Sequence, residues 1–578
     1  MTVSSKKMRG AQAMAETLVE LGVRRVYGIP GAQNVEFFDS LEGVDLETVL
    51  VTHELGASFM ADAEARLTGR PGVIAVVPGP GLTNCLTGLA EAYMDSVPVV
   101  CIASGVRARL PFRYQLHQID QLGMAAPVCK KVFRVESPEE IPALTTEAFR
   151  LAASGEPGPV VIEFPSDLAL EKSRMDSVVL PDEATPIDRI QVGKIADRLL
   201  AAQKVGLYVG QGVFGHQADL RIIAEHLQAP VATTISGRGA LPEDDPLSVG
   251  FGMTDSGHPA AVEAFSRCDL VLAVSCKFGE VSTGSYGMNY QGELIHVDIN
   301  PEVLGTNYEA SMHLAAPAGP FLKALRRRIE DTPAREEDRE LKELIAHHKQ
   351  AVEKEGSQAK KRPDSVAPER FMVELSRRMP RDTVMVTDSG GHMFWAISHF
   401  PIRAERSFLA PVDYQSMGYG TPAAVSAAIE CAGKRPVVAT IGDGCFLMTG
   451  IEMLTAVRRK VPLLLVVFRD KELGIIRQIQ EKMYARPAAV DLSEGPDFQK
   501  LAEGFGAEYR LIAGDEEVST VLDEVVPVSG PTVLEVRVRY DKWNRYFQGA
   551  LKANMRSLSK MQILGMGLRL LKRKIFGV

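Results

Sequence analysis

Two aspartates in the last third of the chain have the side-chain type and spacing of a magnesium–phosphate site. Asp443 stands between two glycines after the β-branched run 437–441, and Asp470 follows the apolar run 461–468. An amphipathic segment separates the runs, which predicts a strand–helix–strand unit with both aspartates at the carboxyl ends of neighbouring parallel strands. Mg²⁺ prefers carboxylate and phosphate oxygens, and glycines allow the backbone to approach a phosphate. The pattern therefore predicts an anchor for a magnesium-bound diphosphate.

The elements that must position these side chains form three α/β units. Strands alternate with helices in each unit, which is typical of a parallel sheet covered by helices. The second unit contains a G-x-G-x-x-G loop at 210–215 that opens a helix at 217–227, and alone this pattern is a dinucleotide-binding signature. We expect units at 1–180, 190–330 and 366–540, a proline- and acid-rich linker at 181–188, a charged helical or flexible connector at 331–365 and a tail at 541–578.

Composition narrows the class of protein. The chain has 578 residues, 46% of them hydrophobic, and a net charge of −8, which argues against general nucleic-acid binding. Seven cysteines without a C-x-x-C pair predict neither a zinc site nor a disulfide framework. The first ten residues are polar, and no apolar run reaches about 18 residues, the length needed to span a membrane. We therefore expect a cytoplasmic enzyme.

Further motifs stand far upstream of the two aspartates. His53-Glu54 follows the apolar run 48–51 and opens a small-residue helix at 55–67, while glycine-rich motifs occur at 26–31 and 76–84. Their order and spacing resemble the thiamine-diphosphate-dependent superfamily of acetolactate synthase, pyruvate oxidase and 2-hydroxyacyl-CoA lyase. The resemblance extends to about residue 540. It implies three doubly wound parallel-sheet domains: a pyrimidine-binding domain, a central Rossmann-like domain and a diphosphate-binding domain.

The resemblance also implies roles for individual residues. Glu54 is the expected catalytic residue, which hydrogen-bonds N1′ of the aminopyrimidine. Met417 would wedge between the two cofactor rings, and the carbonyl of Gln415 would accept the 4′-amino group. His392 would contact the diphosphate, with a buried structural histidine as the alternative. The remaining cofactor contacts would come from Gly31, Asn84, Gly391, Gly442, Gly444, Cys445 and Gly474, and the magnesium ligands would be Asp443, Asp470 and the main-chain carbonyl of Glu472.

Several positions depart from the family pattern. In the family, the second part of the magnesium-binding motif is Asn-Asn, whereas this chain has Arg469-Asp470 at that place. On the substrate side, Ser166 replaces a lysine of the synthases, Ile479 replaces a tryptophan, and Leu116-His117-Gln118 replaces Phe-Gln-Glu. Near the active site, His117 and Gln118 would handle protons or bind the acceptor, with surface polar roles as the alternative. Lys277-Phe278-Gly279 replaces the Arg-Phe-Asp of flavin-binding relatives, which disfavours FAD; some relatives hold ADP in the central domain instead.

We therefore expect a thiamine-diphosphate- and Mg²⁺-dependent carboligase or decarboxylase acting on 2-oxo acids. A 2-hydroxyacyl-CoA lyase is the alternative, and a nicotinamide-dependent oxidoreductase is weaker because 230–238 lacks an acidic ribose ligand. A non-catalytic paralogue is disfavoured by the intact acidic residues. The family's subunit-spanning cofactor site implies a homodimer or homotetramer.

The tail has a different character from the rest of the chain. Residues 541–578 contain nine Lys or Arg and one acid, and five apolar residues between 561 and 575 share one helical face. A basic amphipathic helix can lie on an anionic membrane surface. The alternative is a lid over the active site whose basic residues meet CoA phosphates.

Overall fold

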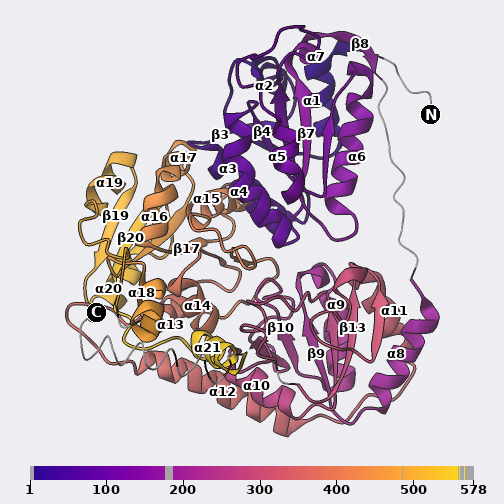
Figure 1. The fold of residues 1–578 in the computed structure, drawn as a ribbon. Helices are drawn as coiled ribbons and strands as arrows, with labels where there is room; N and C mark the ends of the chain where they lie inside the picture. The colour runs from indigo at the N-terminus through magenta and orange to yellow at the C-terminus, as the bar shows by residue number, and fades with distance from the viewer. Residues whose placement is uncertain are drawn as a thin grey trace. The chain divides into compact units, whose positions relative to one another are not determined.

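A computed structural model describes residues 6–175, 187–288, 290–484, 486–557, 559, 561 and 565 (Figure 1). Contacts divide the chain into two compact units. The first comprises residues 1–184, 414–433 and 449–461, and the second comprises 185–413, 434–448 and 462–578. Each unit is described by itself below. Most of the expected linker at 181–188 and of the apolar face at 561–575 lies outside the described residues.

The first unit is built on a six-stranded parallel sheet with the strand order β3-β2-β4-β5-β7-β6. Its central strands are apolar and buried along their whole length, as parallel strands covered on both faces must be. A short antiparallel pair, β1 with β8, forms a separate two-stranded sheet. The strands are β1 Lys6–Arg9, β2 Arg25–Gly28, β3 Glu47–Leu50, β4 Gly72–Val76, β5 Val99–Gly105, β6 Lys131–Arg134, β7 Val160–Pro165 and β8 Lys172–Met175.

Helices cover both faces of this sheet (Figure 1). Alternate strand residues such as Val73 and Ala75 join one apolar core with α1, α2 and α6, whereas Ile74 and Val76 face the side of α3 and α4. This alternation follows from the two-residue period of a strand. The helices are α1 Gly10–Glu20, α2 Val35–Glu42, α3 Glu54–Thr68, α4 Pro80–Met94, α5 Gln121–Ala125, α6 Ile141–Ala153 and α7 Ser166–Leu170.

Two helices from much later in the chain complete the first unit. α15 (Gly420–Cys431) packs along α3, and α17 (Met453–Arg459) packs beside α15. The hydroxyl of Tyr419 donates to Asp62 Oδ1 at 2.8 Å, and that of Ser426 donates to the carbonyl of Met60 at 2.7 Å. Because α15 covers α3, ten consecutive residues of α3 are buried.

The second unit contains two further six-stranded parallel sheets, of which the first has the order β11-β10-β9-β12-β13-β14. The predicted glycine loop follows β9, and α9 begins at the predicted residue. A Cβ at Gly210 would lie 1.7 Å from the carbonyl oxygen of Ser275, so close packing against this neighbouring loop requires glycine there. The elements are β9 Val205–Val209, β10 Val231–Thr233, β11 Ser248–Phe251, β12 Leu270–Val274, β13 Glu293–Asp298, β14 Met312–Ala315, α8 Arg189–Ala201, α9 Gln217–Leu227, α10 Pro259–Ser266 and α11 Ala318–Ile329.

The other sheet of the second unit carries the two aspartates and has the order β16-β15-β17-β18-β20-β19. β17 and β18 pair in parallel, with Gly442 opposite Phe468, as the spacing predicts. The elements are β15 Val384–Thr387, β16 Phe408–Leu409, β17 Val437–Gly442, β18 Leu463–Arg469, β19 Glu508–Ile512, β20 Pro531–Arg537, α13 Pro368–Arg378, α14 Gly391–His399, α16 Asp443–Thr449, α18 Gly474–Tyr484, α19 Phe498–Phe505 and α20 Val518–Val525. The three parallel sheets confirm the predicted α/β class.

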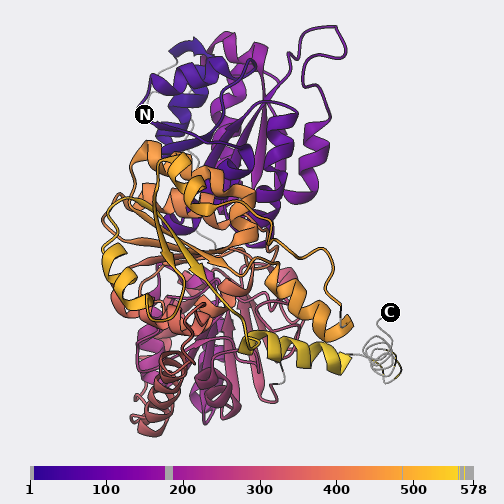
Figure 2. The ribbon, with the colours of Figure 1, turned by 90° about the vertical axis from the view of Figure 1, so that its left-hand side faces the viewer.

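The charged connector is a regular helix, α12 (Arg339–Ser357), with one apolar edge. Leu341 and Ile345 on this edge join the core of the central sheet, so the helix is held by packing as well as solvated by its charges. The helix α21 (Arg545–Ser557) is drawn in yellow in Figure 2. Its Tyr546 stacks on Phe394 of α14 with ring centroids 4.2 Å apart.

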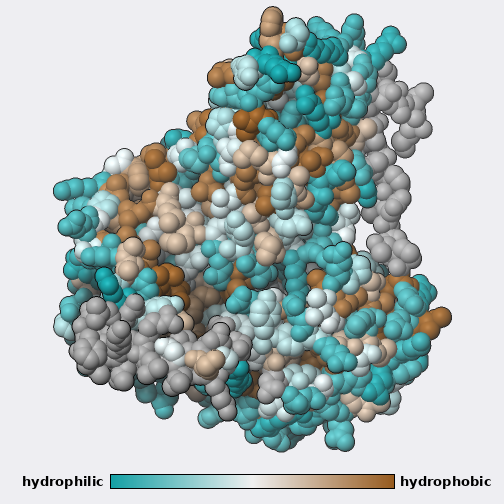
Figure 3. Space-filling model, viewed as in Figure 1, coloured by the Kyte–Doolittle hydropathy of each residue, from teal (hydrophilic) through white to brown (hydrophobic). Residues whose placement is uncertain are grey.

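Over the face shown in Figure 3, apolar side chains are interspersed with polar ones. The loop that precedes α5 exposes several large apolar residues, among them Phe112, Tyr114 and Leu116. Within the described part of the chain, no helix has the length and apolarity needed to cross a bilayer.

Candidate active site

Asp443 and Asp470 lie at adjacent strand ends in the second unit. Asp443 begins α16, and its carboxylate is only 3% exposed. Its Oδ1 accepts from the backbone N–H of Gly444 at 2.9 Å, and its Oδ2 accepts from that of Lys471 at 2.8 Å. The second bond joins the loop after β17 to the loop after β18. The glycine beside Asp443 and the residue after Asp470 therefore fix the carboxylate from both sides.

Both aspartates are shifted away from their ordinary acidity. Burial raises the pKa of Asp443 to about 6. Burial also raises the pKa of Asp470 to about 8, and the nearby carboxylates of Asp443 and Glu472 add to the rise. Like charges held together out of water favour the protonated form. A divalent cation between the two would reverse that preference.

His392 is the second notable group beside this loop. It lies in the first turn of α14, is 3% exposed, and burial lowers its pKa to about 3. A hydrogen bond with the backbone of Asp388 opposes that shift, while Nε2 is buried without a partner among the described residues. A Cβ at Gly390 would lie 2.4 Å from the imidazole, and one at Gly442 would lie 3.3 Å from it. Glycines on both sides therefore make room for this ring.

The other predicted residues of this edge gather around the same loops. Cys445 directs its thiol to the carbonyl of Ser389 at 3.2 Å. A Cβ at Gly474 would lie 2.3 Å from Asp470 Oδ2, so the carboxylate rests against the start of α18. The side chain of Glu472 pairs with Arg477, which leaves its main-chain carbonyl as the expected ligand. Sequence reasoning missed Tyr540, whose ring lies 3.7 Å from the Cβ position of Gly391.

In the first unit, the structure joins two predicted residues directly. Glu54 is the first residue of α3, and its Oε2 accepts from Nδ2 of Asn84 at 3.0 Å. His53 caps the helix, because its Nδ1 accepts from the backbone N–H of Leu55 at 3.1 Å. The thiol of Cys85 donates to the carbonyl of Glu54 at 3.3 Å. The carboxylate of Glu54 is therefore oriented by α4 as well as by its own helix.

Two glycine motifs surround this glutamate's end of the sheet. A Cβ at Gly31 would lie 2.5 Å from Val77, which brings the first motif against the second. Gly79 has φ +65° and lies against the backbone of His117, which itself has φ +69°. His117 is half-buried with no partner for Nδ1 among the described residues, whereas Gln118 is exposed and its Oε1 caps the turn at Gln115. In the structure, the side chain of Gln118 thus stabilises its own turn.

The loop with Gln415 and Met417 also belongs to the first unit. Gln415 has φ +56°, a left-handed conformation, and the next backbone N–H, that of Ser416, donates to Oε2 of Glu91 at 2.9 Å. Burial raises the pKa of Glu91 to about 9, with Asp95 adding to the rise. Sequence reasoning missed Glu91 because it lies within a small-residue helix and shows no pattern of its own. Met417 is half-buried.

The residues of the second unit fit a magnesium-bound diphosphate. Two buried aspartates with raised pKa values favour a cation, and the unpartnered Nε2 of His392 favours an anion beside it. A phosphate oxygen near this ring would stabilise the imidazolium, which donates from Nε2. No group of three or more His, Cys, Asp or Glu side chains forms a metal site by itself among the described residues. The expected site has two side-chain ligands and takes its other oxygens from backbone and diphosphate.

Comparisons with known proteins place the chain in a family. The N-terminal TPP binding domain of thiamine pyrophosphate enzymes matches residues 8–124, their central domain matches 192–325, and their C-terminal TPP binding domain matches 388–536. The chain belongs to the thiamine pyrophosphate enzymes.

Relatives define the type within that family. The chain is 32% identical over 550 residues to a probable acetolactate synthase large subunit of Methanocaldococcus jannaschii, with 92% of each chain covered. It is 33% identical over 541 residues to the acetolactate synthase isozyme 2 large subunit of Escherichia coli, covering 92% of this chain and 96% of the relative. It is also 33% identical over 572 residues to an acetolactate synthase of Mycobacterium bovis, covering 93% and 89%. This protein is a thiamine-diphosphate-dependent enzyme of the acetolactate synthase type.

Proposed function

We propose that this protein is a Mg²⁺-dependent carboligase that decarboxylates a 2-oxo acid and joins the remaining acyl group to a second carbonyl compound. The observation that carries the proposal is the pair of buried aspartates, Asp443 and Asp470, beside His392, whose Nε2 has no partner among the described residues. Thiamine diphosphate supplies a carbon nucleophile and an electron sink for the C–C bond that breaks. The protein needs no nucleophile of its own.

The chain's own residues have distinct tasks in this proposal. Asp443, Asp470 and the carbonyl of Glu472 hold Mg²⁺, and His392 with the backbone of Gly442, Gly444, Cys445, Gly391 and Gly474 holds the diphosphate. Glu54, oriented by Asn84 at 3.0 Å, shares a proton with the aminopyrimidine. Gly31 would let the backbone approach the cofactor, and Met417 and the carbonyl of Gln415 would contact it. The constrained loop at Gln415 suits a rigid support of this kind.

The substrate side rests on fewer residues. His117, half-buried with a free ring nitrogen beside Gly79, is proposed to bind the acceptor or to move its proton. Gln118 is proposed to assist it by holding the turn in which His117 sits. The relatives named acetolactate synthase favour a small 2-oxo acid as donor. FAD remains disfavoured. A Cβ at Gly212 would lie 2.4 Å from Ser275 Oγ, so close packing within the protein accounts for the glycine in this loop without a bound dinucleotide.

The remaining expectations belong to the same proposal. The working assembly is a homodimer or homotetramer in the cytoplasm, and the domains run over 1–180, 190–330 and 366–540, with a connector at 331–365 and a basic tail at 541–578. The exposed apolar loop with Phe112 and Tyr114 supports a covered surface in the first unit. Peripheral membrane contact through the tail is the least supported of these expectations. Co-sedimentation of the full chain with anionic vesicles tests it.

A product screen tests the proposal. Purified protein with thiamine diphosphate and Mg²⁺ is supplied with pyruvate, longer 2-oxo acids, aldehydes and acyl-CoA thioesters, and products are identified by mass spectrometry. We expect a 2-hydroxy-2-alkyl-3-oxo acid from 2-oxo acids, and none from Glu54→Gln. Cleavage of a 2-hydroxyacyl-CoA without carboligation would instead assign the protein as a lyase. Absence of cofactor binding in calorimetry would overturn both assignments.

A further inference from the structure

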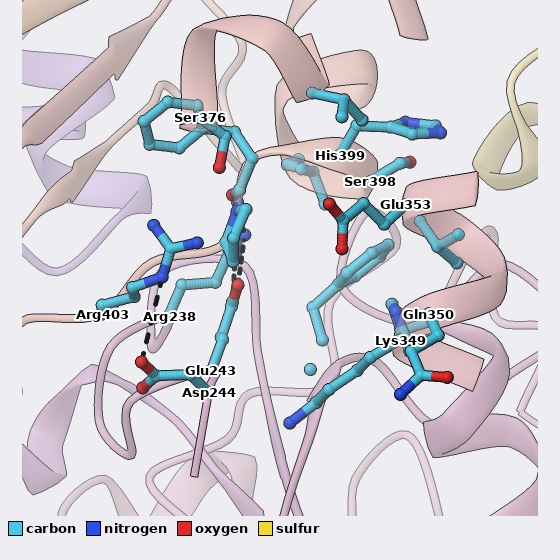
Figure 4. A pocket seen from close by; sticks show the side chains of 18 of the residues that line it. Arg238, Glu243, Asp244, Lys349, Gln350, Glu353, Ser376, Ser398, His399 and Arg403 are labelled. Atoms are coloured by element: carbon cyan, nitrogen blue, oxygen red, sulfur yellow. Dashed lines mark hydrogen bonds and ion pairs between the residues drawn. The ribbon is translucent and has the colours of Figure 1, made fainter. Parts of the chain in front are cut away.

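A cavity of about 280 Å³ lies in the second unit, away from the two aspartates. Its walls come from the loops around β11, from α12 and from α13 and α14 (Figure 4). Figure 4 shows Arg238, Glu243 and Asp244 on one side of the cavity and Lys349 with Gln350 across from them. None of these residues has a part in the site described above.

Arg238 is a charged side chain built into this cavity. It is 1% exposed, and its guanidinium donates to both carboxylate oxygens of Glu243 at 2.7 Å and to the carbonyl of Phe400 at 2.8 Å. These bonds engage Nε and Nη2, whereas Nη1 is buried without a partner in the described structure. A buried N–H without an acceptor is costly, so a ligand that accepts from it would be stabilised.

The other carboxylates of the cavity already have arginine partners. Asp244 pairs with Arg381 and lies 3.9 Å from Arg403. Glu353 accepts from Arg377 at 2.8 Å. The carboxylates are thus neutralised by arginines before any ligand arrives, and the cavity does not repel an anion.

Lys349 and His399 supply further polar groups. Among the described residues, Lys349 has no carboxylate within ion-pair distance, and its ammonium donates only to the carbonyl of Asp245 at 3.0 Å. Burial lowers its pKa, and the carboxylates of Glu243, Asp245 and Asp244 partly oppose that shift. His399 is 8% exposed, and at least one of its ring nitrogens is buried without a partner in the described structure.

Another part of the cavity wall is apolar. Phe251, Val373, Ile397 and Phe400 line it, and each is at most 5% exposed. A ligand that fits both walls has one anionic end and a short hydrocarbon body.

We propose that this cavity is a binding site for a small aliphatic monocarboxylate, whose carboxylate contacts Lys349 and Nη1 of Arg238 and whose hydrocarbon end packs on Val373 and Ile397. Charge-assisted hydrogen bonds from two cations provide specificity for the acid over its amide. The site regulates cofactor binding through α14, because this nine-residue helix has His399 and Ile397 at the cavity and His392 in its first turn. This second part rests on the proposed diphosphate contact of His392.

The test uses 3-methylbutanoate, which lacks a 2-oxo group and so is not a substrate, with 3-methylbutanamide as the uncharged control. Calorimetry with the full-length protein is expected to show saturable binding of the acid and none of the amide. Lys349→Met should weaken binding at least tenfold, whereas Lys354→Met, an exposed lysine of the same helix, should leave it unchanged. Circular dichroism checks that both variants fold.

Each outcome decides one part of the proposal. No binding of the acid, equal binding of acid and amide, or binding that Lys349→Met leaves intact would overturn the site. For regulation, saturating 3-methylbutanoate should shift the dissociation constant of thiamine diphosphate with Mg²⁺ at least threefold. An unchanged constant would overturn the coupling. The acid-binding result involves no turnover, so its failure is distinguishable from failure of the proposed carboligase.

Discussion

Glu452 and Thr52 are joined by three hydrogen bonds although 400 positions separate them in the chain. The carboxylate of Glu452 accepts from the backbone N–H of Thr52 at 3.2 Å and from its hydroxyl. A Cβ at Gly56 would lie 2.6 Å from the same carboxylate, which therefore sits beneath the first turn of α3. The residue that α3 presents at this turn is Glu54. Glu452 thus fixes the junction from which the proposed catalytic carboxylate projects.

We expect Glu452→Gln to lower both thermal stability and turnover. The amide keeps the size of the side chain but weakens the hydrogen bonds that the carboxylate accepts from Thr52 and from the hydroxyl of Thr455, a loss of about 1–3 kcal/mol. Thermal unfolding and steady-state kinetics measure the two effects. The matched control is Glu503→Gln, an exposed glutamate of α19, which should change stability by less than about 0.5 kcal/mol. Equal unfolding temperatures for the two variants would contradict the role of Glu452.

Glu54→Gln should bind thiamine diphosphate with Mg²⁺ but show no measurable turnover, because glutamine cannot exchange a proton with the aminopyrimidine. Asn84→Ala should reduce kcat by about tenfold, since removal of one orienting hydrogen bond typically costs about 1–1.5 kcal/mol. Calorimetry and initial rates separate binding from chemistry. Thr83→Ala, one residue earlier in α4, serves as the control. A Glu54→Gln enzyme with wild-type kcat would refute the assignment.

The pKa values of Asp443 and Asp470 predict how the apoprotein responds to pH. Both are raised, to about 6 and about 8, above an unfolded value near 3.9, so the folded state binds more protons between these limits. Stability contributed by the pair is therefore full below about pH 4 and is lost as pH rises to about 8. Unfolding temperatures across this range measure the loss. In Asp470→Asn the slope should become shallower; an unchanged slope would contradict the shift.

The affinity for Mg²⁺ should change with pH in the opposite direction to the stability of the apoprotein. The ion requires deprotonated carboxylates, so its apparent affinity in the presence of thiamine diphosphate should increase from pH 5 to 8 and then level off. Equilibrium titration with Mg²⁺ at fixed ionic strength measures this dependence. A flat profile would show that these aspartates are not the titrating ligands.

Gly474→Ala should weaken Mg²⁺ binding. A Cβ there would lie 2.3 Å from Asp470 Oδ2, so either the carboxylate or the start of α18 must move. We expect the dissociation constant for Mg²⁺ to rise at least fivefold, with little change in secondary structure. Gly504→Ala is the matched control, because no atom lies within 4 Å of its Cβ position and alanine favours a helix by about 0.5–1 kcal/mol. Equal affinities in the two variants would contradict the close packing.

Much of the fold follows from local patterns. Strands such as β9 and β17 begin at their predicted residues because buried parallel strands form short β-branched runs bounded by glycines. The adjacency of β17 and β18 follows from the strand–helix–strand order. α4 begins at Pro80, inside the glycine-rich motif at 76–84, because a proline is tolerated in the first turn of a helix. The burial of Leu341 and Ile345 of α12 could not be predicted, because charged residues dominate the sequence around them.

Site residues that belong to local sequence motifs could be predicted. Residues that come together only through contacts between distant parts of the sequence could not. The bond between Asn84 and Glu54 joins two motif residues, and both were predicted from the resemblance. Glu91, Glu452 and Tyr540 carry no local pattern, and only tertiary packing places them beside Ser416, Thr52 and Gly391. The roles of the predicted residues stay predictions until the measurements above are made.

The late origin of α15 and α17 has a consequence for how the chain is made. α15 packs on α3 and contributes to the burial of ten consecutive residues of that helix, yet residue 461 leaves the ribosome long after residue 180. At about 5–20 residues per second, the interval is roughly a quarter of a minute to a minute. During translation the face of α3 that α15 covers therefore stays open until the later segments are made.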